Sequence, residues 1–173
     1  NLMKFKKFVY KKIKNTNLIA HKKIKLGYKS GIVTAELQTN GKGQYGKKWI
    51  SLRGNVFVSI FLNLNKKILL KKITQYNCNL IKKSLKQFTH NKITIKKPND
   101  LLIKNQKFCG ILQEVIKFKK SEFIIIGIGV NVVKSPYIYG YPTTYLNKYS
   151  TRKIFKDDVI KGIKKIFEKE YIY

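Results

Sequence analysis

The chain has 173 residues, 43% of them hydrophobic, so it can bury a core, and its length favours a single domain, residues 1–173, over two. Its formal net charge of +30 would suit an anionic partner, but only Arg53 and Arg152 of its 38 basic residues are arginine, and the lysines are scattered. Specific readers of nucleic acid usually rely on arginine, aromatic stacking platforms or a helix-turn-helix, and none of these is clear here. The charge therefore indicates a solvated lysine surface and disfavours binding to specific DNA.

The first half of the chain predicts strands that alternate with helices. The expected elements are a strand at residues 5–13, a helix from about residue 17 toward 26, strands at 31–38 and 55–64, and a helix at 69–88. Asn15 and Thr16 can cap the first helix, and Gly27 can end it. Apolar side chains alternate with a period of two in residues 55–64, whereas in residues 69–88 they recur at helical intervals.

The second half predicts a meander of strands followed by one helix. The expected strands are residues 92–96, 101–103, 107–118 and 122–133, with turns at 98–100 and 105–106. The last helix is expected to begin near Ser150 or Thr151 and to carry the apolar residues Ile154, Val159, Ile163 and Phe167. These elements predict an α+β fold, with helices packed on a mixed, mostly antiparallel β-sheet.

Neither the cysteines nor the apolar segments indicate a secreted or membrane protein. Cys78 and Cys109 are far apart in the sequence and outside any C-x-x-C pair, and no cluster of Cys and His could hold a metal. We expect two unpaired thiols in a reducing compartment, the cytoplasm. The longest apolar run, residues 123–133, is too short to span a bilayer, so no membrane partner is expected.

The stretch GKGQYG, residues 41–46, matches the pattern G-x-G-x-x-G but lacks the context of a dinucleotide-binding loop. Such a loop opens a helix and is followed about 20 residues later by an acid. Here the next predicted element is a strand, and no Asp or Glu lies between Glu36 and Asp100. We expect a loop between two strands, in which backbone N–H groups and nearby lysines hold an anion. A plain glycine-rich connection is the alternative.

Several segments, in the same order, resemble the motifs of biotin protein ligases. The stretch LQTNGKGQYGKKWISLRGNVFVSI resembles their G-[RK]-G-x-x-G-[RK]-x-W loop, and KKPNDLLIKNQKFCGILQE is similar to their K-W-P-N-D-L and K-x-x-G-I-L-x-E segment. Weaker matches are IKNTN to [DE]-S-T-N, GIGVNV to G-[IV]-G-[IV]-N-V, and YPTTYLN to P-A-T-S-L. Ordered motifs that cover most of the chain are far more specific than any one of them.

The resemblance implies the fold of the biotin/lipoate ligase catalytic domain, which is similar to that of class II aminoacyl-tRNA synthetases. It implies a ligase that joins biotin to ATP as biotinyl-5′-AMP, with Mg²⁺, and then transfers biotin to a lysine of a biotin carboxyl carrier domain. The oligomeric state stays open, with a homodimer as one possibility. We expect no N-terminal helix-turn-helix domain, and we expect the family's small C-terminal β domain to be absent or outside this chain.

The resemblance also assigns roles to individual residues. Lys107 falls on the catalytic lysine, which grips the biotin carboxylate and the α-phosphate together. The positions implied for biotin are Asn15, Thr16, Asn17, Gln38, Gly41, Lys42, Gly43, Gln44, Lys107 and Gly110. Those implied for ATP or the adenylate are Lys42, Lys47, Trp49, Lys96, Asn99, Asp100, Lys107 and Asn131, with Trp49 over the adenine and Asp100 also on Mg²⁺.

The chain departs from the family pattern at three positions of these motifs. Gln44 stands where most members carry Arg, Lys97 replaces the Trp of K-W-P-N-D, and Asn15 replaces the Ser of S-T-N. The missing Arg implies looser retention of the adenylate. Two other functions stay open: a lipoate or octanoate ligase or transferase of the same fold, although the R-R-x-x-G-G-G signature is absent, and a basic nucleic-acid-binding module.

Overall fold

The computed structural model describes residues 3–64 and 69–172. Within them, seven strands form one sheet in the order β1-β2-β3-β7-β6-β5-β4, in which β1 and β2 are parallel and all other neighbours antiparallel. The strands are β1 (Lys7–Ile13), β2 (Ser30–Gln38), β3 (Val56–Leu64), β4 (Ile93–Lys96), β5 (Asp100–Ile103), β6 (Gln106–Phe118) and β7 (Ser121–Val130). The helices are α1 (Thr16–Lys25), α2 (Leu70–Leu85) and α3 (Lys156–Glu170), with 3-10 turns η1 (Gln44–Gly46), η2 (Lys86–Phe88) and η3 (Leu146–Tyr149). The predicted α+β fold is confirmed.

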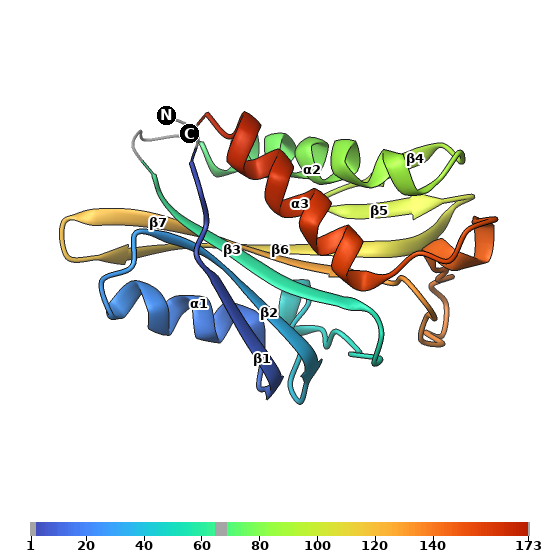
Figure 1. Cartoon of the computed structure of the whole chain (residues 1–173), viewed down its shortest axis with the longest axis horizontal. Coiled ribbons are helices and arrows are strands. Elements are labelled where there is room, and N and C mark those ends of the chain that lie inside the picture. The colour runs from blue at the N-terminus through green and yellow to red at the C-terminus, as the bar shows by residue number, and fades with distance from the viewer. Residues whose placement is uncertain (1–2, 65–68, 173) are drawn as a thin grey trace.

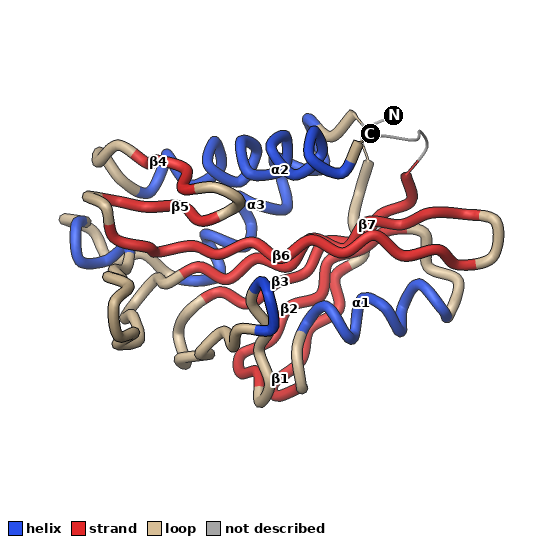
Figure 2. The backbone as a smooth tube through the Cα atoms, turned by 180° about the vertical axis from the view of Figure 1, so that it is seen from behind, coloured by secondary structure: helices blue, strands red, loops and turns tan. Residues whose placement is uncertain are grey.

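Helices cover both faces of this sheet. Helices α2 and α3 pack together on one face, and α1 lies on the other (Figure 1). The larger core lies between the sheet and the α2–α3 pair, and a smaller core lies beneath α1. Figure 2 shows the η1 segment on the same side of the sheet as α1. That face is therefore shared between a helix and a loop.

Strand β7 presents different side chains to the two faces. Its apolar residues at the even positions 124–130 belong to the larger core. On the other face, Phe123 and Ile125 pack in the smaller core with α1, and Gly127 and Gly129 follow them. Because successive side chains point to opposite faces of a strand, this alternation leaves the sheet bare where the glycines lie.

The first helix is capped as its sequence predicts. The Asn15 side chain accepts a hydrogen bond from the Leu18 N–H at 2.8 Å, which satisfies one of the free amides of the first turn. Gly27 lies just beyond the C-terminal end with φ of +97°, in the left-handed region that favours glycine. The cap fixes where α1 begins and so places Thr16 and Asn17 at its first turn.

The third helix begins at Lys156, so the predicted start near Ser150 or Thr151 is wrong. The Ser150 hydroxyl donates to the Arg152 carbonyl at 2.6 Å and accepts from the Arg152 N–H at 3.2 Å, a local turn that competes with a helix. Asn147 bonds both the carbonyl and the N–H of Ile154, at 2.9 and 2.7 Å, and holds it outside the helix. Ile154 is nevertheless buried in the core, as expected.

The last strand ends at Val130 instead of residue 133. The N–H groups of Val132 and Val133 both donate to Asn55 Oδ1, at 2.9 and 3.0 Å, in place of a neighbouring strand. A buried side chain thus ends the β-ladder, and the chain turns away from the sheet at Asn131.

Both cysteines are free and buried, as expected from their spacing. Burial, with a smaller contribution from the charge of Asp100, raises the pKa of the Cys78 thiol to about 11. Burial also raises the pKa of Cys109. Among the described helices, none combines the length and apolar character needed to cross a bilayer.

Helix α2 allows a test of this packing. Ile81 is 0% exposed in the larger core, whereas Leu70, on the same helix, is 54% exposed. We expect Ile81→Ala to lower the free energy of unfolding by about 2–5 kcal/mol, because it leaves a cavity, and Leu70→Ala to lower it by less than about 0.5 kcal/mol. Urea unfolding followed by circular dichroism measures both values. Equal losses would show that α2 does not pack with this face inward.

Candidate active site

A cavity of about 780 Å³ lies beside the first turn of α1, on the face of the sheet that this helix covers. Its walls come from the start of α1, the end of β2, the glycine loop, the β4–β5 turn, strands β6 and β7, and the loop of residues 131–143. The residues singled out in the sequence that line it are Asn15, Thr16, Asn17, Gln38, Lys42, Gly43, Gln44, Lys47, Trp49, Lys96, Asn99, Asp100, Lys107, Gly110 and Asn131. The fold therefore brings together motifs that lie up to about a hundred residues apart.

Gly41 is a predicted site residue that does not line the cavity. Its carbonyl accepts a hydrogen bond from the Trp49 N–H at 2.9 Å, and a Cβ at Gly41 would lie 2.5 Å from the Trp49 carbonyl oxygen. Only glycine fits there, because the two ends of the loop touch. Gly41 thus shapes the loop instead of facing a ligand.

The glycine loop lies between strands β2 and β3, as the sequence analysis expects. It folds back on itself, with the Gly43 N–H donating to the Lys47 carbonyl at 2.7 Å and a β-bridge between Lys42 and Lys48. Gly46 has φ of +73°, which glycine adopts without strain. This small hairpin directs Lys42, Gln44 and Lys47 toward the cavity.

Trp49 lies on a floor made of glycines. Gly110 of β6 pairs with Gly129 of β7, and a Cβ on them would lie 2.7 and 2.4 Å from atoms of the Trp49 ring. The indole Nε1 is buried and has no hydrogen-bond partner among the described residues. Gly127 and Gly129 belong to the motif GIGVNV but were given no role from the sequence, although alternate glycines within a strand are a signal of close approach.

Hydrogen bonds among side chains, and between side chains and the first turn of α1, hold the polar end of the cavity in place. Gln38 accepts from the Thr16 N–H at 2.9 Å and donates to the Ser51 hydroxyl at 3.1 Å. The buried Ser59 hydroxyl lies 2.7 Å from Thr16 Oγ1 and 2.5 Å from Asn17 Oδ1. Ser51 and Ser59 both lie in the stretch that resembles the family's glycine loop, but neither was given a role from the sequence.

The charged end of the cavity is centred on one carboxylate. Lys107 Nζ lies 2.9 Å from Asp100 Oδ1, with side chains only 20% and 22% exposed. The Tyr141 hydroxyl donates to Asp100 Oδ2 at 2.7 Å. Burial and the neighbouring Asp100 raise the pKa of the Tyr141 phenol well above its usual value. Tyr141 is a further residue that the sequence analysis did not select.

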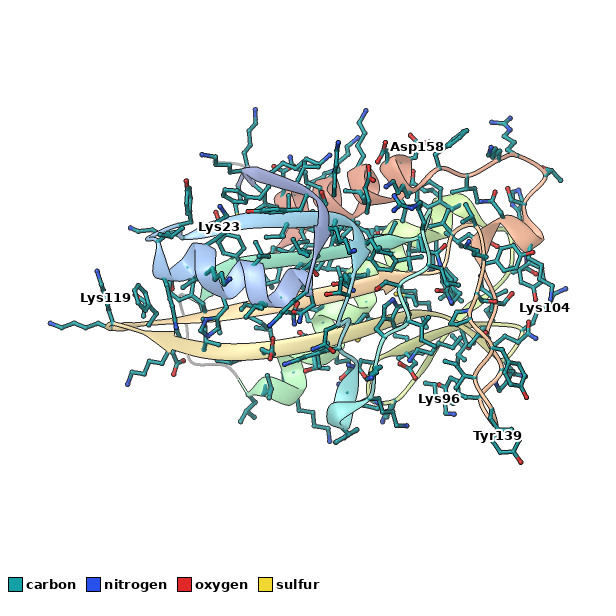
Figure 3. The ribbon with its side chains drawn as sticks, turned by 90° about the horizontal axis from the view of Figure 1, so that it is seen from below. Lys23, Lys96, Lys104, Lys119, Tyr139 and Asp158 are labelled. Carbon is teal, nitrogen blue, oxygen red and sulfur yellow. The ribbon has the colours of Figure 1, made fainter. Side chains whose placement is uncertain are left out.

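Lysines surround this carboxylate. The lysines that line the cavity are Lys42, Lys47, Lys48, Lys96, Lys97 and Lys107, and Asp100 is the single acid among the lining residues that the structure describes. Figure 3 shows Lys96 and Tyr139 at one end of the molecule and Lys119, in the β6–β7 turn, at the other. The cavity is therefore strongly electropositive and suited to an anionic ligand.

Two predicted nucleotide contacts bond mainly to the protein's own backbone. The side-chain amide of Asn99 donates to the Ile111 carbonyl, and that of Asn131 donates to the Thr144 carbonyl at 3.1 Å. Both side chains are almost fully buried. They hold the β4–β5 turn and the loop after β7 in place around the cavity.

The site offers a metal ion one carboxylate. No group of three or more His, Cys, Asp or Glu residues that could hold a metal is found in residues 3–64 and 69–172. Asp100 alone fits the role of a single carboxylate toward Mg²⁺, which in nucleotide sites commonly takes its other ligands from phosphates and water.

Comparisons with known proteins agree with this geometry. The model of the biotin/lipoate A/B protein ligase family matches residues 8–131. The bifunctional ligase/repressor BirA of Bacillus subtilis is 32% identical over 151 residues, which cover 81% of this chain and 45% of that protein. The crystal structure of biotin protein ligase from Leishmania major in complex with biotinyl-5-AMP has a TM-score of 0.80 at 21% identity, covering 94% of this chain and 73% of that one.

A second solved structure is similar over nearly the whole chain. The crystal structure of biotin acetyl coenzyme A carboxylase synthetase from Helicobacter pylori, with bound biotinylated ATP, has a TM-score of 0.72 at 25% identity, and the match covers 95% of this chain and 74% of that one. This chain spans less than half the length of the Bacillus relative. Since the family model matches well over half of the sequence, the chain belongs to the biotin/lipoate A/B protein ligase family.

Proposed function

We propose that this domain activates biotin with ATP to biotinyl-5′-AMP and transfers the biotin to a lysine of a biotin carboxyl carrier domain. The observation that carries the proposal is the shape of one cavity, which joins an uncharged polar end at Thr16 and Gln38 to a lysine-rich end at Lys107. Biotin has a polar, uncharged ureido ring at one end and a carboxylate at the other, so its two ends match the two ends of the cavity.

The charges explain why lysine is needed at the centre. In the first step a carboxylate oxygen of biotin attacks the α-phosphorus of ATP, a new O–P bond forms, and the bond to the β-phosphate breaks to release pyrophosphate. Two anions must meet, so catalysis consists largely of positioning and charge neutralisation. In the second step a lysine amine of the carrier attacks the acyl carbon, and AMP leaves. Lys107 would bind the carboxylate and the α-phosphate together.

The remaining predicted residues divide between the two substrates. Thr16, Asn15, Asn17 and Gln38 would hydrogen-bond the ureido ring or orient the residues that do. Trp49 would stack on the adenine, and Lys96 and Asn131 would flank the nucleotide. Mg²⁺ would enter with ATP and touch Asp100, where it would neutralise phosphate charge.

A lipoate or octanoate ligase is the alternative within the same family. The dithiolane ring and the alkyl chain of those substrates carry no hydrogen-bonding groups. When they filled the cavity, they would leave unpaired any donors and acceptors of Thr16 and Gln38 that are not already used by bonds within the protein. Unpaired buried polar groups cost about 1–3 kcal/mol each, which favours biotin.

We propose a single catalytic domain in the cytoplasm, in keeping with its two free thiols. A homodimer stays a prediction.

Lys107→Ala tests the catalytic assignment. We expect the variant to fold and to lose about 10²–10³ of the rate of biotin-dependent exchange of labelled pyrophosphate into ATP, because charge that builds on the reacting oxygens loses its partner. Lys117→Ala, an exposed lysine on the same strand, is the control and should exchange normally. Near-normal exchange by a folded Lys107→Ala would contradict the assignment, and exchange that depends on lipoate instead of biotin would favour the alternative.

Gln44→Arg tests the departure in the glycine loop. Arg carries a fixed charge and five donors in a planar fork, whereas Gln offers a neutral amide. We expect the wild-type protein to hold biotinyl-5′-AMP loosely and label bystander lysines, and Gln44→Arg to release it about tenfold or more slowly, as a hydrogen bond to a charged group is worth about 1.5–3 kcal/mol. Gln44→Lys, which adds charge without the fork, is the matched control. Equal release and equal selectivity for all three proteins would show that another element closes the loop.

The net charge of +30 gives a test of the nucleic-acid alternative. We expect weak, sequence-independent binding to DNA that is lost near physiological salt, because scattered lysines neutralise phosphates without reading bases. Fluorescence anisotropy over a range of salt concentrations measures it. Nanomolar binding to one site at physiological salt would rank DNA binding above the enzyme.

The positive surface should instead speed association with an acidic carrier domain, at a rate that falls with ionic strength.

A further inference from the structure

We propose that Tyr141 is a positioning residue of this reaction. Its hydroxyl holds the carboxylate of Asp100 so that Asp100 engages the Lys107 ammonium through one oxygen and leaves the other N–H groups free for substrate. The inference rests on the proposed function, which gives Lys107 the biotin carboxylate and the α-phosphate as partners. Tyr141 directly precedes the residues of YPTTYLN that match P-A-T-S-L, and no site residue was assigned from that segment.

The three side chains form one chain of contacts. Asp100 Oδ1 lies 2.9 Å from Lys107 Nζ, and Asp100 Oδ2 accepts from the Tyr141 hydroxyl at 2.7 Å. Both oxygens of the carboxylate are therefore bonded, one on each side. A carboxylate that is held at both oxygens cannot turn about its Cβ–Cγ bond without breaking one of the two bonds.

The backbone links Tyr141 to Lys107 as well. The Lys107 N–H donates to the carbonyl of Pro142, the residue after Tyr141, at 2.9 Å, and the Thr144 N–H donates to the Lys107 carbonyl at 2.8 Å. The Thr143 hydroxyl closes the loop by donating to the Pro136 carbonyl at 2.6 Å. The loop and the lysine are thus fixed to each other, and their side chains reach Asp100 from two directions.

The number of available donors explains why this matters. A lysine ammonium has three N–H donors, and one is used by Asp100 Oδ1. Without the phenol, Oδ2 would lack a donor in a side chain that is only 22% exposed, and Lys107 is already within reach. The freed carboxylate would turn and take a second N–H of Lys107, in competition with the oxygens of the substrate.

The aromatic ring of Tyr141 has a separate role that phenylalanine would keep. Lys96 Nζ lies 4.4 Å and Lys107 Nζ 5.5 Å from the ring centroid, so the ring contacts two cations by its face. Tyr141→Phe therefore removes the hydroxyl and retains the ring. The variant isolates the bond to Asp100, and we expect its melting temperature to be close to that of the wild type.

The kinetic test compares Tyr141→Phe with Tyr137→Phe in the biotin-dependent exchange of pyrophosphate into ATP. Tyr137 lies in the same loop and is 86% exposed, so loss of its hydroxyl should change nothing. For Tyr141→Phe we expect kcat to fall about tenfold to a hundredfold, with KM for biotin and ATP within about twofold, because the ammonium is needed most where charge develops. In a Lys107→Ala background the same change should alter the rate by less than about twofold, since no ammonium remains to be positioned.

A kcat equal to that of the wild type, or an equal loss in the Lys107→Ala background, would overturn the proposal. A crystal structure of Tyr141→Phe without substrates is the measurement that does not depend on activity. We expect both Asp100 oxygens within hydrogen-bond distance of Lys107 Nζ, and an Asp100 that has not turned would overturn the proposal. If the wild-type protein shows no biotin-dependent exchange, the proposed function fails, and the crystal structure still decides whether Tyr141 holds Asp100.

Discussion

The cavity depends on one constraint, which is that β6 and β7 carry no side chains where the Trp49 ring lies. The pair Gly110 and Gly129 lets the ring approach the backbone, and a Cβ on Gly129 would lie 2.4 Å from it. The backbone N–H of Trp49 donates to the Gly41 carbonyl, so displacement of the ring would also move the glycine loop. Strand β7, which carries Gly129, also buries apolar side chains on its other face. The backbone beneath the Trp49 ring is therefore anchored to the larger core.

Charge in the cavity is organised by contact more than by composition. At physiological ionic strength, charges more than about 8 Å apart across water are largely screened, so the net charge of the chain says little about any one lysine. Lys107 differs from Lys42 or Lys47 because a carboxylate lies 2.9 Å from its ammonium. Asp100 therefore orients the ammonium of Lys107, whereas the other lysines of the cavity contribute only to its positive potential.

Periodicity in the sequence predicted strand β3 and helices α2 and α3, because burial of alternating or helically spaced side chains decides them. Capping residues predicted α1, and turn residues separated the later strands. The start of α3 was missed because hydrogen bonds of Ser150 and Asn147 compete with the helix, and their partners are known only from the fold. All but one of the residues that the family motifs selected line the cavity, the exception being Gly41. The motifs did not select Tyr141, which meets Asp100 across 41 positions of sequence. Gly127 and Gly129 did have a local signal, the alternation of glycine with isoleucine and valine.

The two ends of the cavity are built in different ways, and this has a consequence for specificity. At the polar end, Gln38, Thr16 and Ser59 bond to one another or to nearby backbone, and a buried network of that kind is rigid and costly to leave unpaired. At the charged end, Asn99 and Asn131 fix loops through backbone carbonyls, and the groups that face a ligand are long lysine side chains. Flexible ammonium groups tolerate many anions, whereas fixed amide and hydroxyl groups reject a ligand that cannot pair with them. If the domain has the proposed function, discrimination between biotin and other acids should therefore come from the polar end, and the charged end should supply rate.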